Sequence, residues 1–120
     1  REYPWGKEDP NCSLTNYHNQ KCGRDTTAVA SYPNGKSPYG AYDMAGNVWE
    51  WVSDWYAPDF YKYSPYENPA GPATGDFHVV RGGSWSSSYA HIETYNRQRD
   101  FSRGFVSPIG FRCAKIAATP

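Results

Sequence analysis

The sequence predicts a loop-rich domain in which short strands alternate with turns, rather than a helical bundle or a doubly wound sheet. Its 120 residues include 5 Trp, 11 Tyr and 5 Phe, whereas Leu14 is the only leucine. A further 11 residues are glycine and 10 are proline, and both residue types interrupt helices and favour turns. We therefore expect a core built mainly from large rings, with short strands between the turns.

The length and the charge of the chain limit what it can be. A chain of 120 residues is one domain at most, so residues 1–120 are treated as a single domain. Lys and Arg number 12 and Asp and Glu number 12, so the net charge is zero. This balance does not favour nucleic acid or an anionic membrane as a partner. No apolar run is long enough to span a bilayer and no signal peptide is present, although a mature secreted chain would also lack one.

Three segments are expected to form strands. Residues 48–53 partly alternate between apolar and polar after a tight turn at residues 45–47. Residues 78–85 predict a strand that runs into a glycine break, and residues 109–114 predict a final strand. A long loop is expected between the first two strands because that segment is rich in proline and glycine.

Four motifs carry a resemblance to a known family. They are YPWG at residues 3–6, DMAGNVWEW at 43–51, RGGSW at 81–85 and GFR at 110–112. In order and spacing they resemble the formylglycine-generating enzyme/sulfatase-modifying factor family. The resemblance implies an α+β, C-type lectin-like fold that is loop-rich with small antiparallel sheets, in agreement with the composition.

The resemblance also implies that part of the family domain is missing. YPWG lies in the middle of the domain in the family, so we expect the amino-terminal strands and helices to be absent here, whether the chain is a fragment, a processed chain or a minimal version of the domain. A strand edge without its neighbour is usually paired or covered in folded proteins. A partner chain or a homo-oligomer is therefore expected.

A structural calcium ion is implied by the resemblance at the DMAGNVWEW turn. Carried over by position, its ligands would be the side chains of Asp43 and Glu50 and the backbone carbonyls of Gly46 and Val48. Calcium binds several oxygen ligands, and a tight turn can aim carbonyls between two carboxylates. The alternative is that Asp43 caps the turn while Glu50 faces solvent or pairs with an arginine.

The three cysteines are Cys12, Cys22 and Cys113. Cys12 and Cys22 enclose a polar segment with turn residues and have neither a CxxC spacing nor a second ligand pair, so a disulfide is favoured over a zinc or redox pair. Such a bridge predicts an extracytoplasmic location, which is periplasmic, cell-surface or secreted. Cys113 lies in an apolar segment and is expected to be buried. A second family calcium site near Asn16 is left open, because the segment that completes it is shorter here and carries the cysteines.

The family's catalytic chemistry is not expected of this chain alone. In the family's enzyme, two cysteines that bind copper lie a few residues after the RGGS motif. Ser87 and Ile92 occupy those positions here. A serine hydroxyl binds copper(I) far less well than a thiolate does, and isoleucine does not bind it at all. No catalytic residue is therefore assigned.

Residues 86–109 are polar and aperiodic and form the expected ligand-binding face. Many relatives carry arginine at the positions of Glu93 and Arg97, so the first is reversed in charge here. Variable proteins of diversity-generating retroelements resemble this chain in having such a segment before the terminal GFR. Rings and arginines suit recognition of a protein or glycan, although some rings could belong to the core instead. The expected contact residues are Ser86, Ser88, Tyr89, His91, Glu93, Tyr95, Arg97, Arg99, Phe101, Arg103 and Phe105.

Two functions are compatible with these features. The favoured one is a non-catalytic, calcium-stabilised binding or adhesion module that recognises a protein or glycan through residues 86–105. The alternative is the substrate-binding part of an enzyme of the formylglycine-generating or sulfoxide synthase type, completed by another chain or domain. In that enzyme, Tyr95, Arg97 and Arg99 would bind an anionic or amino-acid substrate.

Overall fold

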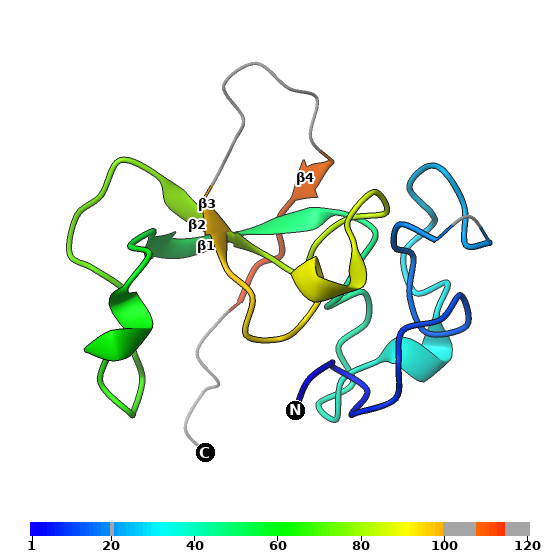
Figure 1. Ribbon diagram of the computed structural model, residues 1–120, viewed down its shortest axis with the longest axis horizontal. Helices are drawn as coiled ribbons and strands as arrows, with labels where there is room; N and C mark the ends of the chain where they lie inside the picture. Colours follow the sequence, from blue (N-terminus) through cyan, green and yellow to red (C-terminus); the bar gives the residue numbers. More distant parts are fainter. Residues whose placement is uncertain (20, 100–107, 115–120) are drawn as a thin grey trace.

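A single small sheet organises the computed structural model, which describes residues 1–19, 21–99 and 108–114 (Figure 1). Its four strands lie in the order β3-β2-β1-β4. The amino-terminal loops lie on one side of the sheet and the long loop after β1 on the other (Figure 1). The strands are β1 (Trp49–Trp55), β2 (His78–Arg81), β3 (Gln98–Arg99) and β4 (Ile109–Gly110), and the short 3-10 helices are η1 (Pro33–Gly35), η2 (Phe60–Lys62) and η3 (Tyr89–His91).

The sheet is mixed rather than purely antiparallel. β1 and β2 are antiparallel, with Glu50 opposite Arg81 and a register shift further along β1. β3 is antiparallel to β2, whereas β4 runs parallel to β1 with Trp49 opposite Ile109. A parallel pair needs a long crossover, and the chain between the two strands supplies it. The loop-rich α+β prediction is therefore confirmed, with one parallel pair added.

The predicted strands begin close to the expected positions but differ in where they end. β2 stops at Arg81 because Gly82 and Gly83 follow with φ angles of +85° and +69°, which no regular strand accommodates. The strand expected over residues 109–114 ends at Gly110. Cys113, predicted to be buried, is therefore exposed beyond the end of the sheet.

The buried cluster lies beside the sheet and joins distant parts of the chain. It consists of Tyr3, Tyr17, Ala45 and Ile92, and Trp5 packs against it. The rings of Tyr3 and Trp5 stack with their centroids 5.2 Å apart. The YPWG motif is thus anchored in the core, as expected of a domain stabilised by large rings.

The turn before β1 holds two of the sequence motifs together. Gly46 N donates to the Gly82 carbonyl at 2.7 Å, and Asn47 N donates to the Asn16 carbonyl at 2.7 Å. Gly46 has a φ of +78°, and a Cβ there would lie 2.3 Å from the Asn16 carbonyl oxygen. Glycine is therefore required at this position both by its conformation and by the close approach of the neighbouring backbone.

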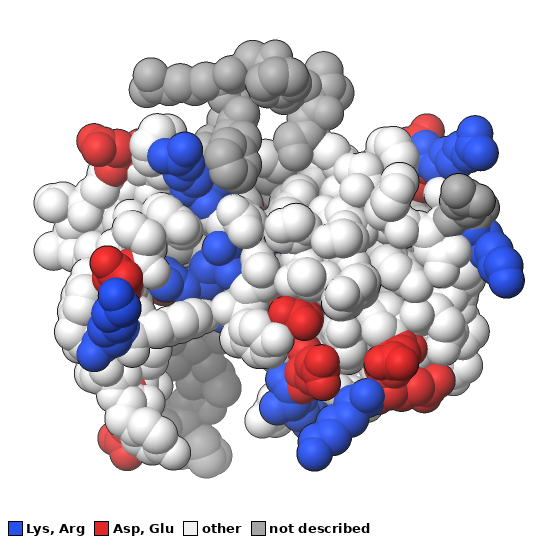
Figure 2. All heavy atoms as spheres, viewed as in Figure 1, with Lys and Arg blue, Asp and Glu red and all other residues white. Residues whose placement is uncertain are grey.

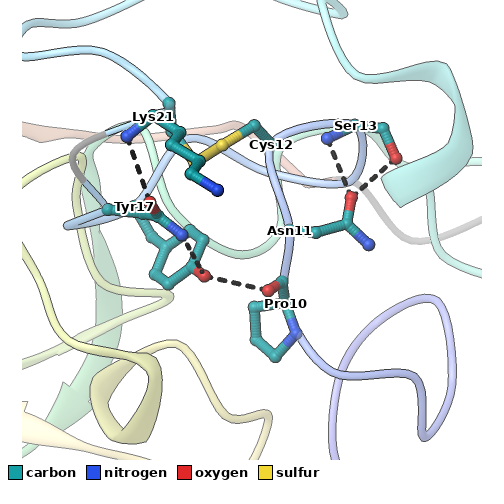
Figure 3. Close-up of a disulfide and its surroundings, with 8 residues drawn as sticks. Pro10, Asn11, Cys12, Ser13, Tyr17 and Lys21 are labelled. Atoms are coloured by element: carbon teal, nitrogen blue, oxygen red, sulfur yellow. Dashed lines mark hydrogen bonds between the residues drawn. A yellow bond between two sulfur atoms is a disulfide. The ribbon is translucent and has the colours of Figure 1, made fainter.

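The predicted disulfide between Cys12 and Cys22 is confirmed, with their Cα atoms 4.8 Å apart (Figure 3). The loop that it closes is also held by the Tyr17 hydroxyl, which donates to the Pro10 carbonyl at 2.9 Å (Figure 3). This bridge and bond fix an amino-terminal segment that contains no strand in its described part.

Charged side chains are scattered over the surface. On the face drawn in Figure 2, basic and acidic groups of the described residues alternate on a mainly uncharged background, and no broad area carries one sign. None of the helices in the described part of the chain has the length and apolarity needed to cross a membrane.

Candidate ligand-binding site

A cavity of about 370 Å³ lies beside the first part of the predicted ligand face. We call it the serine cavity. Its lining comes from β1, β2 and β4, from the segment after the glycine break and from the amino-terminal loop. The lining residues are His18, Trp49, Val80, Ser86, Ser87, Ser88, His91 and Ile109.

A tight turn after Gly83 builds one wall of the serine cavity. Ser87 N donates to the Ser84 carbonyl at 2.9 Å, and Ser84 N donates back to the Ser87 hydroxyl at 2.9 Å. The Ser84 hydroxyl lies 3.0 Å from that of Ser86. Such local bonds between serine side chains and backbone stabilise turns. The hydroxyl that stands at the family's cysteine position is therefore used to close this turn.

The remaining polar wall is formed by two histidines. Ser88 Oγ lies 3.1 Å from His91 Nδ1, and the Trp49 ring meets the His91 ring edge-on at 6.2 Å. His18 N donates to the Ser87 carbonyl at 2.8 Å, which places His18 in the lining. Among the described residues, neither a carboxylate nor a lysine or arginine lines this cavity. Its hydroxyls, rings and apolar base suit neutral polar groups of a ligand.

His18 and Trp49 line the cavity but were not among the predicted site residues. Trp49 begins β1, and its motif indicated only a strand. His18 lies almost seventy positions before Ser87, and only the backbone bond between them brings it to the cavity. No local pattern around His18 could have predicted this contact.

Ile92, at the second cysteine position of the family, belongs to the core. Its exposed fraction is 1%. A Cβ on Gly83 would lie 2.6 Å from Ile92 Cγ2, so the side chain fills the space above the glycine break. The two residues predicted to occupy the family's cysteine positions, Ser87 and Ile92, thus contribute to a turn and to packing, respectively.

The tyrosines of the predicted face have different surroundings from the serines. Tyr89 and Tyr95 are both exposed and do not line the serine cavity. Glu93 is half-buried, and a hydrogen bond from the Tyr95 hydroxyl to Glu93 is the main cause that raises the pKa of Tyr95 to about 12. Phe101, Arg103 and Phe105 lie outside the described residues.

The arginines of the predicted face pack against rings. Arg97 lies over the Tyr61 ring at 4.0 Å and donates to the Ala57 carbonyl at 3.3 Å. Its Nε is buried without an acceptor. Arg99 lies over the Phe77 ring at 5.4 Å. Arg97 therefore attaches the loop after β1 to β3, and it does not reach the serine cavity.

At the predicted calcium turn, Arg112 binds the acidic side chain at the start of β1. Its Nε donates to Glu50 Oε2 at 2.6 Å, and its Nη2 also binds the Glu50 carboxylate. Nη1 donates to the Tyr42 carbonyl at 2.9 Å, and Nη2 to the Asp43 carbonyl at 3.2 Å. The hydrogen bonds to Glu50 raise the pKa of Arg112. The structure therefore contains the ion pair that was predicted as the alternative to calcium binding, in which Glu50 pairs with an arginine.

The oxygen donors near this turn match a calcium ion in part. Asp43 Oδ2 accepts from Ala30 N at 2.7 Å, which leaves its other oxygen for a further partner. Asn16 Oδ1 is buried without a hydrogen-bond partner, and Asn16 Nδ2 lies 3.3 Å from Asn47 Oδ1. An amide oxygen of this kind is an ordinary calcium ligand. Among the described residues, no group of three or more His, Cys, Asp or Glu side chains gathers at one point.

The chain is similar to parts of longer curated proteins. It is 46% identical over 115 residues to the serine/threonine-protein kinase pkn1 of Chlamydia caviae, covering 94% of this chain and 18% of the relative. The formylglycine-generating enzyme of Streptomyces coelicolor is 44% identical over 99 residues, covering 77% and 30%. The chain thus spans less than a third of either relative.

A solved structure agrees with the fold. Treponema denticola variable protein 1 superposes with a TM-score of 0.69 at 33% identity, covering 82% of this chain and 34% of that one. The profile of the family described as "Sulfatase-modifying factor enzyme 1-like domain" matches residues 1–117. The chain belongs to the sulfatase-modifying factor enzyme 1-like family.

Proposed function

We propose that this chain is a non-catalytic module that binds a protein or glycan ligand through residues 86–105, with the serine cavity at its centre. The observation that carries the proposal is the convergence of Ser86, Ser88 and His91 on one cavity. The two positions of the family's cysteine pair serve a turn and the core instead. The likeness to a variable protein supports a module of this kind.

The chemistry of the serine cavity indicates the kind of contact it would make. Hydroxyl and imidazole groups exchange hydrogen bonds with neutral hydroxyls or amides, and the Trp49 ring supplies an apolar surface. Its volume of about 370 Å³ suits one sugar ring or one side chain of a larger ligand. The exposed rings of Tyr89 and Tyr95 would extend the contact outside the cavity.

Filling the cavity tests this proposal. Ser88→Trp places a large ring at the exposed wall, and Ser31→Trp adds the same ring at another exposed serine as the matched control. Both variants and the unmodified chain are applied to a glycan array and to a displayed peptide library. Ligands bound by the unmodified chain should be lost in Ser88→Trp and kept in Ser31→Trp. Binding that survives in Ser88→Trp would place the ligand elsewhere.

We also propose that a calcium ion stabilises the DMAGNVWEW turn. Its ligands would be the Asp43 and Glu50 side chains with the Gly46 and Val48 carbonyls. Two observations support the proposal. Ala30 N occupies only Asp43 Oδ2, so Oδ1 can bind another partner, and the buried Asn16 Oδ1 accepts no hydrogen bond. Because Arg112 already neutralises Glu50, calcium and the guanidinium would compete for the same carboxylate.

The disulfide supports an extracytoplasmic location, because such bonds persist in oxidising compartments.

The edge strands of the sheet in the described residues are β3 and β4, and each has two residues. The outer edge of each strand has no neighbouring strand there, and such edges are usually paired or covered. A partner chain or a second copy would extend one of these edges. Light scattering on the chromatographed chain tests this, and a monomer at all concentrations would exclude self-association.

An enzymatic role is the second candidate, because the Streptomyces coelicolor relative is a formylglycine-generating enzyme. The chain would then supply substrate contacts to another chain or domain. Copper(I) titration separates the two candidates: tight stoichiometric binding by the unmodified chain would favour the enzyme. No such binding is expected, because Ser87 and Ile92 lack thiolates.

A further inference from the structure

A second cavity, of about 800 Å³, shares no lining residue with the serine cavity. We call it the charged cleft. Its apolar wall includes Tyr39, Met44 and Trp51, with exposed fractions of 97%, 40% and 38%. So much exposed apolar surface around one hollow is typical of a binding site.

One pair of charges in the charged cleft is already neutralised. Arg112 and Glu50 line it together and bind each other. Because their opposite charges neutralise each other, neither Arg112 nor Glu50 requires a charged group from a ligand in the cleft. Arg1 is exposed at the cleft.

Arg81, by contrast, has only neutral hydrogen-bond partners within the described part of the chain. Its Nη1 donates to the Asn96 carbonyl at 2.9 Å, and its Nη2 reaches the Tyr61 hydroxyl at 3.4 Å. The ion pairs of the described residues do not include Arg81. A guanidinium has five N–H donors, so several remain for an acceptor in the cleft. A part-buried cation without an anion favours a carboxylate ligand.

Glu93 carries the opposite charge on the same lining. Its carboxylate accepts the Tyr95 hydroxyl, but no lysine, arginine or histidine among the described residues lies within ion-pair distance. A neutral phenol leaves the negative charge of Glu93 in place. The carboxylate therefore attracts a cationic group of a ligand and repels a purely anionic one.

One turn positions both charges. Asn96 N donates to the Glu93 carbonyl at 3.0 Å, and the Asn96 carbonyl accepts from Arg81. Arg81 and Glu93 thus lie on one cleft, connected through Asn96, yet they do not form an ion pair with each other. A single ligand in this cavity can therefore supply an anion to Arg81 and a cation to Glu93.

The geometry points to a zwitterionic ligand with an apolar body, such as an amino acid. Its carboxylate binds Arg81, its ammonium group binds Glu93, and its apolar part packs against Met44 and Trp51. This site shares no lining residue with the serine cavity, although Glu93 belongs to the proposed ligand face, so Ser88→Trp tests the first site and the probes below test the second.

Three probes with the same aromatic body test the assignment by calorimetric titration of the 120-residue chain. They are phenylacetate, phenethylammonium and phenylalanine, which carry an anion, a cation and both charges. Phenylalanine should bind at least about tenfold more tightly than either singly charged probe, as expected for one additional charge-assisted contact. Equal affinities, absence of binding, or a preference for a singly charged probe would overturn the proposal.

Two variants distinguish the charges. Arg81→Gln should weaken phenylalanine and phenylacetate, whereas Glu93→Gln should weaken phenylalanine and phenethylammonium and strengthen phenylacetate. Lys62→Gln removes an exposed charge outside the cleft and should change none of the affinities. Should Arg81→Gln fail to fold, Glu93→Gln still decides, because unchanged affinities in that variant would contradict the assignment.

Discussion

Arg112 and Glu50, 62 residues apart in the chain, are joined by the guanidinium Nε, which donates to Glu50 Oε2 at 2.6 Å. The same guanidinium donates to the carbonyls of Tyr42 and Asp43. One side chain from beyond β4 therefore connects the start of β1 with the turn that precedes it. Hydrogen bonds to charged groups are among the stronger ones in proteins.

Arg112→Ala should lower the free energy of unfolding by about 1–2 kcal/mol, since partial exposure weakens its charge-assisted bonds. Urea unfolding measures the change. Lys62→Ala is the matched control, because Lys62 pairs with Asp59 at an exposed site and should cost less than about 0.5 kcal/mol. Equal effects of the two substitutions would show that Arg112 does not hold the turn.

Calcium in excess should raise the melting temperature relative to a chelator. A ligand at a hundredfold excess over its Kd stabilises a fold by about 2.7 kcal/mol. Asp43→Asn should remove most of the shift, and Arg112→Gln should increase the calcium affinity because it frees Glu50. Asp59→Asn, at an exposed ion pair, should leave the shift unchanged. Identical melting with calcium and with chelator would exclude the calcium site.

Reduction of the Cys12–Cys22 bridge should destabilise the fold by about 2–3 kcal/mol, because a short closed loop would regain its freedom in the unfolded state. Unfolding in urea with and without a phosphine reductant measures the difference. Cys113→Ser removes only the free thiol, so the effect of the reductant should persist in it. Loss of the effect in that variant would show that Cys113 takes part in the bridge.

Gly35→Ala should be severely destabilising, by about 3 kcal/mol or more, because the new Cβ would overlap backbone that cannot move aside. Its position would lie 1.8 Å from the Leu14 carbonyl oxygen. At Gly110 the nearest atom to a new Cβ is Val48 Cγ2 at 3.3 Å, a side-chain atom that can shift. Gly110→Ala should therefore cost much less, and thermal melting of the two variants should reveal the difference.

Tyr95 should ionise near pH 12, because its hydrogen bond to Glu93 raises the pKa of the phenol to about 12. In Glu93→Gln the pKa should fall toward the ordinary value of about 10. Absorbance titration against Tyr95→Phe isolates this one phenol. An unchanged titration in Glu93→Gln would show that the hydrogen bond does not form.

The fold was predictable where one short motif determines its own geometry. Gly46 and Asn47 both adopt positive φ angles, which glycine and asparagine tolerate best, so the turn within DMAGNVWEW is visible in the sequence itself. The cysteine pair was predictable for a similar reason, since two cysteines in a short polar loop have few other uses. The two cysteines are near neighbours in the chain, whereas the backbone that approaches Gly46 comes from Asn16, thirty residues earlier, so the sequence indicated the turn but not its contacts.

The candidate site was less predictable because its contacts are between distant residues. His18 reaches the serine cavity only through the Ser87 carbonyl, and Arg97 turns toward Tyr61 rather than toward the cavity. The sequence around an arginine near exposed tyrosines does not indicate whether its guanidinium contacts a ligand or an aromatic ring of the same chain. Only the pairing of β2 with β3 decides between the two.

The parallel pairing of β4 with β1 has a consequence for the order of folding. Trp49 can pair with Ile109 only after the intervening chain has been synthesised. This pairing also closes a long loop, which costs more conformational entropy than a local contact does. During synthesis, β1 and β2 can form their hairpin early while one edge of β1 stays open. Refolding should therefore show a fast phase for the hairpin and a slower phase in which the chain around Arg112 docks.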